Sequence, residues 1–282
     1  MVIEIISTIQ TLNQLVLPYN VFTMKWILSI AFSTFTSLVL FGQKQSSDRE
    51  YYQLTVYHYS KASQDSTLDN YLKNAFLPAL HAKGIKQVGV FKPIGNDTAT
   101  EKQLFVVIPF KKLEQVKELN YITSSFKSYT EAGADYLQAK HDNPPYKRME
   151  VSLLYAFELA PTMNLPSLTT PRAERVYEFR SYEGPTEALY KRKVKMFNAG
   201  GEIKLFKRLN FNAIFYAEVI TGAHMPNLIY MTSFDNMEER QKHWKAFGES
   251  PEWKALLADK QYENTVSRNQ TILMRNTDYS DY

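Results

Sequence analysis

The stretch from Asn227 to Leu257 constrains the fold of this 282-residue chain more than any other. Residues Asn227 to Phe234 carry the β-branched, aromatic and thioether side chains of a half-buried strand, and Asp235-Asn236 can cap a helix that runs to Gly248. Four residues of that helix, three or four positions apart, form a stripe that must pack against another element: Met237, Gln241, Trp244 and Phe247. A second short helix can begin at Pro251, with three side chains facing inward: Trp253, Leu256 and Leu257. A strand, a helix across it and a Trp-anchored return make half of a βαββαβ unit.

The first half of the chain predicts the complete order of such a unit. Strands are expected at Tyr51 to Tyr59, Lys86 to Ile94, Gln103 to Phe110 and Arg148 to Phe157. Helices are expected before Gly84 and from about Leu113 to Ala132. This order is that of a ferredoxin-like unit, in which two helices cover one face of a four-stranded antiparallel sheet.

The second half repeats the pattern of the first. Phe91 corresponds to Tyr216, Leu104 to Leu228, Phe110 to Phe234 and Leu113 to Met237, a spacing of 124 or 125 residues that indicates a duplication. Strands are expected at Val176 to Tyr182, Asn212 to Ile220, Asn227 to Phe234 and Gln270 to Arg275, with helices over roughly Glu187 to Asn198 and Asn236 to Lys260.

The predicted fold class is α+β: two tandem ferredoxin-like βαββαβ units that form a pseudo-dimeric α/β barrel. Each unit leaves one sheet face bare, and two copies in one chain can cover each other's bare face. We place the first domain at residues 50–158 and the second at 175–276. Residues 159–174 contain three prolines and form the linker.

Alternation along the second-half strands predicts which side chains point into the barrel. Tyr177 and Phe179 are expected to face the helices. The interior is expected to hold a larger and more polar set: Glu178, Arg180, Tyr182, Ile214, Tyr216, Glu218, Tyr230 and Thr232.

The composition excludes several classes of protein. Hydrophobic residues make up 44% of the chain and aromatic residues 14%, which excludes a disordered or fibrous protein. The 33 basic and 29 acidic residues are mixed along the chain, so no basic tract favours nucleic acid as a partner. There is no Cys, which removes disulfides, thiolate nucleophiles and iron–sulfur ligation.

The N-terminal region is typical of a secretory signal peptide. Met24, Lys25 and Trp26 precede the uncharged run Ile27 to Phe41, which Gly42 follows. We therefore expect residues 24–42 to be a signal peptide, residues 1–23 to be a non-native extension before a start at Met24, and the mature protein to be secreted or periplasmic without a stable membrane span. An uncleaved anchor is the alternative.

Residues 197–256, which begin FNAGGEIKLFKRLNFNAIF and end AFGESPEWKAL, closely resemble the NIPSNAP family in its tandem secreted bacterial form. Residues 71–95, YLKNAFLPALHAKGIKQVGVFKPIG, resemble the degenerate first domain of the same proteins. The resemblance implies a fold of the dimeric α/β-barrel superfamily. That superfamily includes cofactor-free monooxygenases, haem-binding dismutases and dye peroxidases, but the role of the family itself is unsettled, so the resemblance implies a fold and no reaction.

The candidate site residues are polar side chains expected to converge in the barrel: Arg180, Glu178, Glu202, Tyr216, Glu218 and Tyr230. They are either a structural ion-pair network or a set that orients a ligand. His224 follows a strand end, where the rim of a pocket is expected.

No cofactor is expected. The five histidines do not have metal-ligand spacing, so no metal site is expected either. A haem held by His243 is a separate hypothesis.

Three functions stay open. The first is binding of a small, partly apolar ligand in a barrel pocket. The second is a cofactor-free monooxygenase in which Arg180 and Tyr216 or Tyr230 orient an aromatic or quinone-like substrate. The third is a protein-interaction module with a filled barrel. A cavity of several hundred Å³ favours the first two, and a filled interior favours the third. An internal pseudo-dimer is expected, and a further homo-oligomer stays open.

Overall fold

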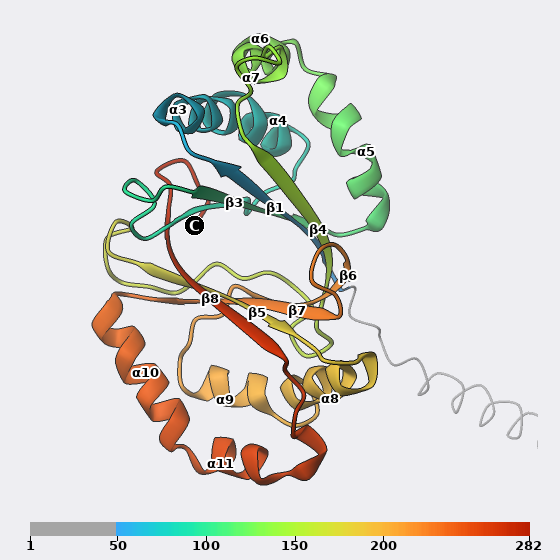
Figure 1. Cartoon of the computed structure of the whole chain (residues 1–282), viewed down its shortest axis with the longest axis vertical. Helices are drawn as coiled ribbons and strands as arrows, with labels where there is room; N and C mark the ends of the chain where they lie inside the picture. The colour runs from blue at the N-terminus through green and yellow to red at the C-terminus, as the bar shows by residue number, and fades with distance from the viewer. Residues whose placement is uncertain (1–48) are drawn as a thin grey trace, which may run out of the picture. The chain divides into compact units, whose positions relative to one another are not determined.

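The computed structural model describes residues 49–282, so the predicted extension and signal peptide lie outside the described residues. The described chain is a mixed α/β fold built around a closed, eight-stranded antiparallel barrel (Figure 1). Its strands are β1 (Tyr51–Tyr59), β2 (Gly89–Pro93), β3 (Lys102–Phe110), β4 (Arg148–Ala156), β5 (Val176–Glu183), β6 (Phe215–Thr221), β7 (Asn227–Phe234) and β8 (Arg268–Asn276). Each predicted strand is thereby confirmed, with ends that shift by at most three residues.

The order of strands around the barrel is β1, β3, β2, β8, β5, β7, β6, β4. Within each half of the chain, the fourth strand pairs with the first, the first with the third, and the third with the second. The two halves are then joined twice, by β2 against β8 and by β4 against β6. The barrel therefore closes through these two junctions, in which two strands of each half pair with two strands of the other half.

The helices form two outer layers, one on each side of the barrel (Figure 1). The first-half layer contains α3 (Ala62–Tyr71), the π-helical turn η1 (Leu72–Phe76), α4 (Leu77–Ala82), α5 (Leu113–Ser124), α6 (Lys127–Ala132) and α7 (Ala134–Leu137). The second-half layer contains α8 (Glu187–Phe197), α9 (Glu202–Arg208), α10 (Met237–Glu249), α11 (Pro251–Ala258) and the 3₁₀ turn η2 (Lys260–Tyr262). Within residues 49–282, no helix is long and apolar enough to cross a membrane.

Apolar side chains from both halves fill the barrel interior. The cluster includes Tyr52, Leu54, Phe91, Phe105, Tyr177, Phe179, Phe215 and Met231, each less than 5% exposed. Two further clusters lie between the sheet and the helices, one in each half. Both faces of the sheet are therefore covered.

The predicted direction of the second-half side chains was wrong, although Ile214 does lie in the interior. Tyr177 and Phe179 point into the barrel, whereas Tyr182, Tyr216 and Tyr230 pack against the helices. Glu178, Arg180, Glu218 and Thr232 share that helix-facing side, because they are an even number of residues from these tyrosines on the same strands. The reason is that all eight residues of β7 are buried, so polarity does not reveal which face is inside.

The chain after β8 also belongs to the barrel. Backbone N–H groups of Thr277 and Asp281 donate to the carbonyls of Val90 and Val88 on the β2 side. The ring of Tyr282 is 2% exposed and its centroid lies 5.9 Å from that of Phe91, within the interior cluster. This tail therefore covers one part of the barrel end.

Candidate functional site

Glu178 is the centre of the polar set that the sequence predicted. Its side chain is fully buried beneath the second-half helices. The carboxylate accepts hydrogen bonds from Arg180 Nε (2.7 Å), Arg240 Nε (2.7 Å), Arg240 Nη2 (3.0 Å) and Trp244 Nε1 (2.7 Å). Arg180 lies on β5 beside it, and Arg240 and Trp244 come from α10.

The electrostatics of Glu178 favour its ionised form. Burial acts to raise the pKa of this carboxyl, but the hydrogen bonds from Arg240 and Trp244 and the charge of Arg180 outweigh burial and hold the pKa below its ordinary value. Both carboxylate oxygens are already engaged by donors. Glu178 therefore anchors α10 to the sheet and has little capacity left to take a proton from a substrate.

Arg180 extends the set toward the tyrosines. Its Nη1 donates to Tyr182 Oη at 2.9 Å, and Tyr182 Oη lies 3.0 Å from Tyr230 Oη. The guanidinium also lies over the Trp244 ring, 4.1 Å from its centroid. Burial raises the pKa of Tyr230 well above its ordinary value, so this phenol stays protonated at neutral pH.

Lys193 and Glu202 form a second buried ion pair under the same sheet. Lys193 Nζ lies 3.0 Å from Glu202 Oε2, and their side chains are 6% and 3% exposed. Burial raises the pKa of Glu202, and the Lys193 charge acts in the opposite direction. The ring of Tyr216 stacks on that of Tyr230 at a centroid distance of 5.6 Å. The structure thus gathers five of the predicted residues on the helix side of the sheet: Glu178, Arg180, Glu202, Tyr216 and Tyr230.

Glu202 reaches this position on an element that the sequence analysis missed. The sequence predicts a helix that ends near Asn198, and Gly201, with a φ of +95°, is the N-cap of the further helix α9. Glu202 is the first residue of that helix and is buried. Its seven residues are too few for a periodic pattern to stand out.

The other predicted residues lie apart from this group. Glu218 contacts Arg49 Nη2 and Tyr190 Oη, each at 3.4 Å. His224 Nδ1 lies 3.5 Å from Glu183 at one mouth of the barrel. His243 Nδ1 is 2.6 Å from the carbonyl of Glu239, and its ring packs against Phe211 and Phe234. Among the described residues, no group of three or more histidines and carboxylates is placed to hold a metal ion.

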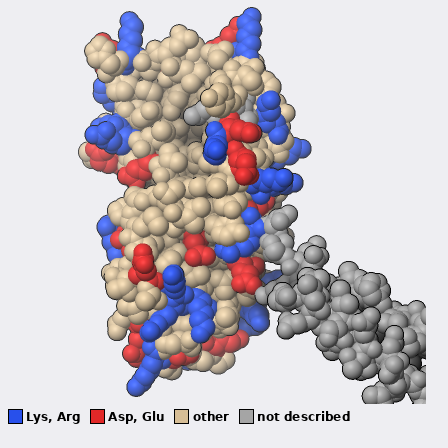
Figure 2. Space-filling view, turned by 90° about the vertical axis from the view of Figure 1, so that its right-hand side faces the viewer, with Lys and Arg blue, Asp and Glu red and all other residues tan. Residues whose placement is uncertain are grey.

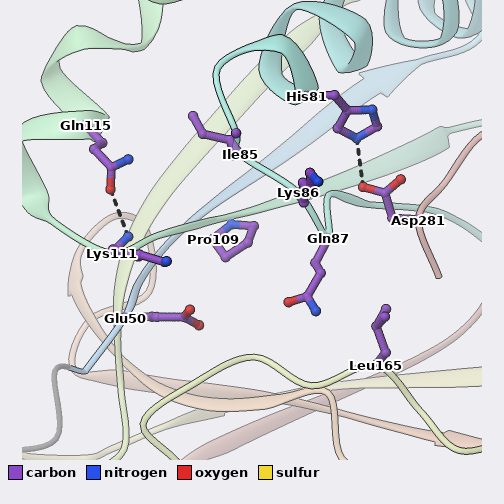
Figure 3. Close-up of a pocket in the computed structure, with 11 residues that line it drawn as sticks. Glu50, His81, Ile85, Lys86, Gln87, Pro109, Lys111, Gln115, Leu165 and Asp281 are labelled. Carbon is purple, nitrogen blue, oxygen red and sulfur yellow. Dashed lines mark hydrogen bonds and ion pairs between the residues drawn. The ribbon is translucent and has the colours of Figure 1, made fainter.

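A cleft of about 800 Å³ is lined mostly by residues of the first half of the chain, and the sequence did not predict it (Figure 3). Its lining comes from β1's N-terminal side, α4 and the loop after it, the end of β3, α5, the segment before β5 and the tail. The lining residues are Glu50, His81, Gly84, Ile85, Lys86, Gln87, Pro109, Lys111, Gln115, Leu165 and Asp281.

Glu50 is the half-buried carboxylate of this cleft. Its Oε2 accepts the backbone N–H of Met163 at 2.7 Å. Burial raises the pKa of Glu50, while the Met163 hydrogen bond and the nearby Lys111 charge partly oppose the rise. In Figure 3 the Glu50 carboxylate points into the space that Gln87 and Lys111 also border. A raised pKa on a carboxyl in a cleft is typical of a site that exchanges protons or hydrogen bonds with a ligand.

His81 and Asp281 form the opposite wall of the cleft. His81 Nε2 lies 2.9 Å from Asp281 Oδ2, and the same oxygen accepts the backbone N–H of Val88 at 2.8 Å. The pair fixes the tail to the end of α4 (Figure 3). Sequence reasoning could not find this pair because its members are 200 residues apart.

Smaller cavities lie elsewhere, and two of them include predicted residues. One of about 430 Å³ runs between α9 and the segment Leu159–Asn164 and reaches Tyr216. The other, of about 190 Å³, opens at the mouth of the barrel and includes His224. On the face in Figure 2, basic and acidic side chains are interspersed, in keeping with the mixed charge of the sequence.

The fold and these sites define an α/β protein with a closed antiparallel barrel, helices outside it, and cavities around rather than through its centre. Residues 177–281 match the family model described as NIPSNAP. This match confirms the NIPSNAP resemblance that the sequence predicted for the second half of the chain.

Solved structures with a similar fold include two candidate monooxygenases. One is from Lactobacillus acidophilus, with a TM-score of 0.55 and 8% sequence identity; the aligned region covers 81% of this chain and 94% of that protein's chain. The other, from Fusobacterium nucleatum, has a TM-score of 0.52 at 7% identity and covers 82% and 93%. A NIPSNAP-like domain protein from Burkholderia xenovorans covers 38% of this chain and 90% of its own, at 17% identity and a TM-score of 0.35. No curated protein sequence matches the chain.

Proposed function

We propose that this protein binds a small, partly apolar organic molecule in the cleft around Glu50. The observation that carries the proposal is a cleft of about 800 Å³ in which a half-buried carboxylate with a raised pKa faces the space bordered by Lys111 and Gln87. Volumes of about 300–1,000 Å³ with a few convergent polar groups are typical of small-molecule sites. Ile85, Pro109 and Leu165 supply apolar wall for the rest of the ligand.

The location differs from the barrel pocket that the sequence suggested. Apolar side chains fill the barrel interior, which is what the protein-interaction hypothesis expected. The cleft beside the barrel nevertheless favours ligand binding, because a pure interaction module does not need a concave site with a desolvated carboxylate.

A ligand screen with matched variants tests this proposal. Compounds found by ligand-observed NMR on the wild-type protein are titrated into Glu50→Gln and Lys111→Ala. Loss of a hydrogen bond to a charged group costs about 1.5–3 kcal/mol, so a ligand held by Glu50 is expected to bind roughly 10–100-fold more weakly to Glu50→Gln. The exposed pair Lys127 and Glu131 provides the controls Lys127→Ala and Glu131→Gln. Equal affinity in all variants would contradict the proposal.

A cofactor-free monooxygenase is the second candidate function. It is supported by the fold similarity to candidate monooxygenases and by the continuous contacts from Arg180 through Tyr182 to Tyr230. If the proposal holds, oxygen uptake with phenolic or quinol substrates is faster in the presence of the protein than in buffer with substrate alone. Arg180→Lys is then expected to lower the rate of oxygen uptake while the circular dichroism spectrum is unchanged. An unchanged rate in Arg180→Lys, or no uptake by the wild type, would speak against it.

We also propose that the two halves are tandem ferredoxin-like units that form an internal pseudo-dimer. The repeated strand order supports this, and so do two pairs of left-handed residues in corresponding loops. Gly84 (φ +78°) corresponds to Asn210 (φ +54°), and Gln87 (φ +63°) corresponds to Asn212 (φ +42°). These pairs are 126 and 125 residues apart, close to the spacing of the sequence repeat.

Secretion or a periplasmic location is proposed on the sequence of residues 24–42. Mass spectrometry of the mature protein from its own host is expected to find an N-terminus near Gly42. A mature chain that retains residues before Met24 would contradict both the predicted start and the predicted cleavage.

A further inference from the structure

The cavity at the barrel mouth is separate from the cleft around Glu50. It has a volume of about 190 Å³, and the ends of strands from both halves surround it. Its floor is apolar and includes Leu54, Val56, Phe105 and Phe179 from the interior cluster. At this volume, below the roughly 300 Å³ at which drug-sized pockets begin, it suits a ligand with few heavy atoms.

Two carboxylates line the wall, and both retain capacity for hydrogen-bond donors. Glu183 is 23% exposed, and its nearest cationic atoms are His224 Nδ1 at 3.5 Å and Arg268 Nε at 3.8 Å, longer than charge-assisted hydrogen bonds. Glu150 lies 3.2 Å from His58 Nε2, but that nitrogen is buried without a hydrogen bond. Within residues 49–282, neither carboxylate accepts a hydrogen bond, in contrast to Glu178.

The charge of the wall favours a cation. Glu150 and Glu183 contribute two negative charges and Arg268 one positive charge, so one negative charge is in excess when His58 and His224 are neutral. A carboxylic acid ligand would add a third negative charge beside two carboxylates that lack donors. An ammonium group would supply the donors that Glu183 lacks. A bare metal ion does not fit, because the described residues do not place three ligands together.

We propose that the barrel mouth is a binding site for a small primary amine with an apolar body. The ammonium donates hydrogen bonds to Glu183, with Glu150 adding to the negative potential, and the apolar body rests on the floor formed by Phe179 and Val56. This site is independent of the proposed function at Glu50.

Phenethylamine is the probe, with 3-phenylpropionate as a carboxylate of similar size and 2-phenylethanol as a neutral one. Calorimetric titration at pH 8 is expected to show saturable binding of the amine and weaker or undetectable binding of the other two compounds. Glu183→Gln is expected to weaken amine binding at least tenfold. Glu249→Gln, an exposed position on α10, is expected to leave it unchanged.

Two further variants keep the test decisive. Val56→Phe fills the floor while the mouth carboxylates remain, and it is expected to abolish amine binding. Glu50→Gln is expected to have no effect on it, so failure of this proposal and failure of the Glu50 proposal are distinguishable. Tighter binding of 3-phenylpropionate, full affinity in Glu183→Gln, or no saturable amine binding at millimolar concentration would each overturn the proposal.

Discussion

Glu178 joins β5 to α10 through donors on both elements. Replacing it with Gln leaves Arg180 and Arg240, each only about a fifth exposed, without a carboxylate partner. Breaking a buried ion pair by removing one partner costs about 3–5 kcal/mol, and we expect Glu178→Gln to lower the free energy of unfolding by that amount. Urea unfolding at pH 7 measures it, and the surface variant Glu249→Gln is expected to stay within about 0.5 kcal/mol of wild type.

The same residue predicts a dependence on pH. Because the folded pKa of Glu178 is below the ordinary value of 4.5, its stabilisation is fully present above pH 4.5 and is lost as the pH falls through the lowered folded pKa. The stability difference between wild type and Glu178→Gln should therefore shrink below pH 4.5. A difference that grows as the pH falls would contradict the assigned direction.

Glu50 predicts the opposite dependence. Its folded pKa is raised above 4.5, so the stability it contributes is present below pH 4.5 and is lost as the pH rises through the folded pKa. Relative to wild type, Glu50→Gln should therefore become more stable as the pH rises through this range. Chemical unfolding at a series of pH values measures it, and a constant difference between the two proteins would show that burial does not perturb this carboxyl.

The residue scale also shows what the sequence could and could not reveal. The identities of Glu178, Arg180 and Tyr230 marked them as members of one group, because they alternate on paired strands. The side of the sheet to which these side chains point could not be predicted, because polar residues on a strand are usually assigned to the face that contacts solvent or a ligand. Here Arg240 and Trp244 on α10 donate to Glu178, and both lie more than 60 residues from it in the chain.

At the scale of the element, α10 depends on its first turn. Asn236 caps the helix, and its side-chain oxygen accepts the backbone N–H of Glu239 at 2.9 Å. We expect Asn236→Ala to cost about 1 kcal/mol and Asn236→Asp to cost much less, because aspartate caps equally well. Thermal unfolding of both variants measures this. Equal losses in the two would show that the cap does not act through its oxygen.

The strands and long helices could be predicted well because their apolar residues recur at a clear period. The strand Asn227–Phe234 has the predicted bounds, and the predicted break before Pro251 separates α10 from α11. Other elements gave no such signal. In the first half, the helix expected before Gly84 contains the π-helical turn η1, which directly precedes α4 and its Pro78, a residue without an N–H group.

At the scale of the whole molecule, the halves are held together by strand pairing as well as by the chain between them. A protease site inserted at the exposed residues 171–174 is therefore expected to give two fragments that elute together and unfold in one transition. Size-exclusion chromatography of the cleaved protein in native buffer tests this, with separation in denaturant as the control. Fragments that separate without denaturant would show that the β2–β8 and β4–β6 pairings do not hold the halves together.

The cleft around Glu50 could not be predicted for a reason that belongs to this scale. Its walls meet only after the barrel closes, since Leu165 and Asp281 come from segments outside the predicted strands and helices. Closure also leaves no free strand edge on the barrel, so another chain cannot extend the sheet by pairing with it.

A closed barrel made from a single chain can also change its two halves independently, which a barrel made from two identical chains cannot do. In a symmetric dimer of identical chains, any substitution occurs in both subunits, so a change that benefits one subunit is also present in the other. Here each half can change alone, and the two differ: the NIPSNAP match lies in residues 177–281, while most of the lining of the cleft around Glu50 comes from the first half. One half can thus keep the residues of the NIPSNAP model while the other carries a separate site.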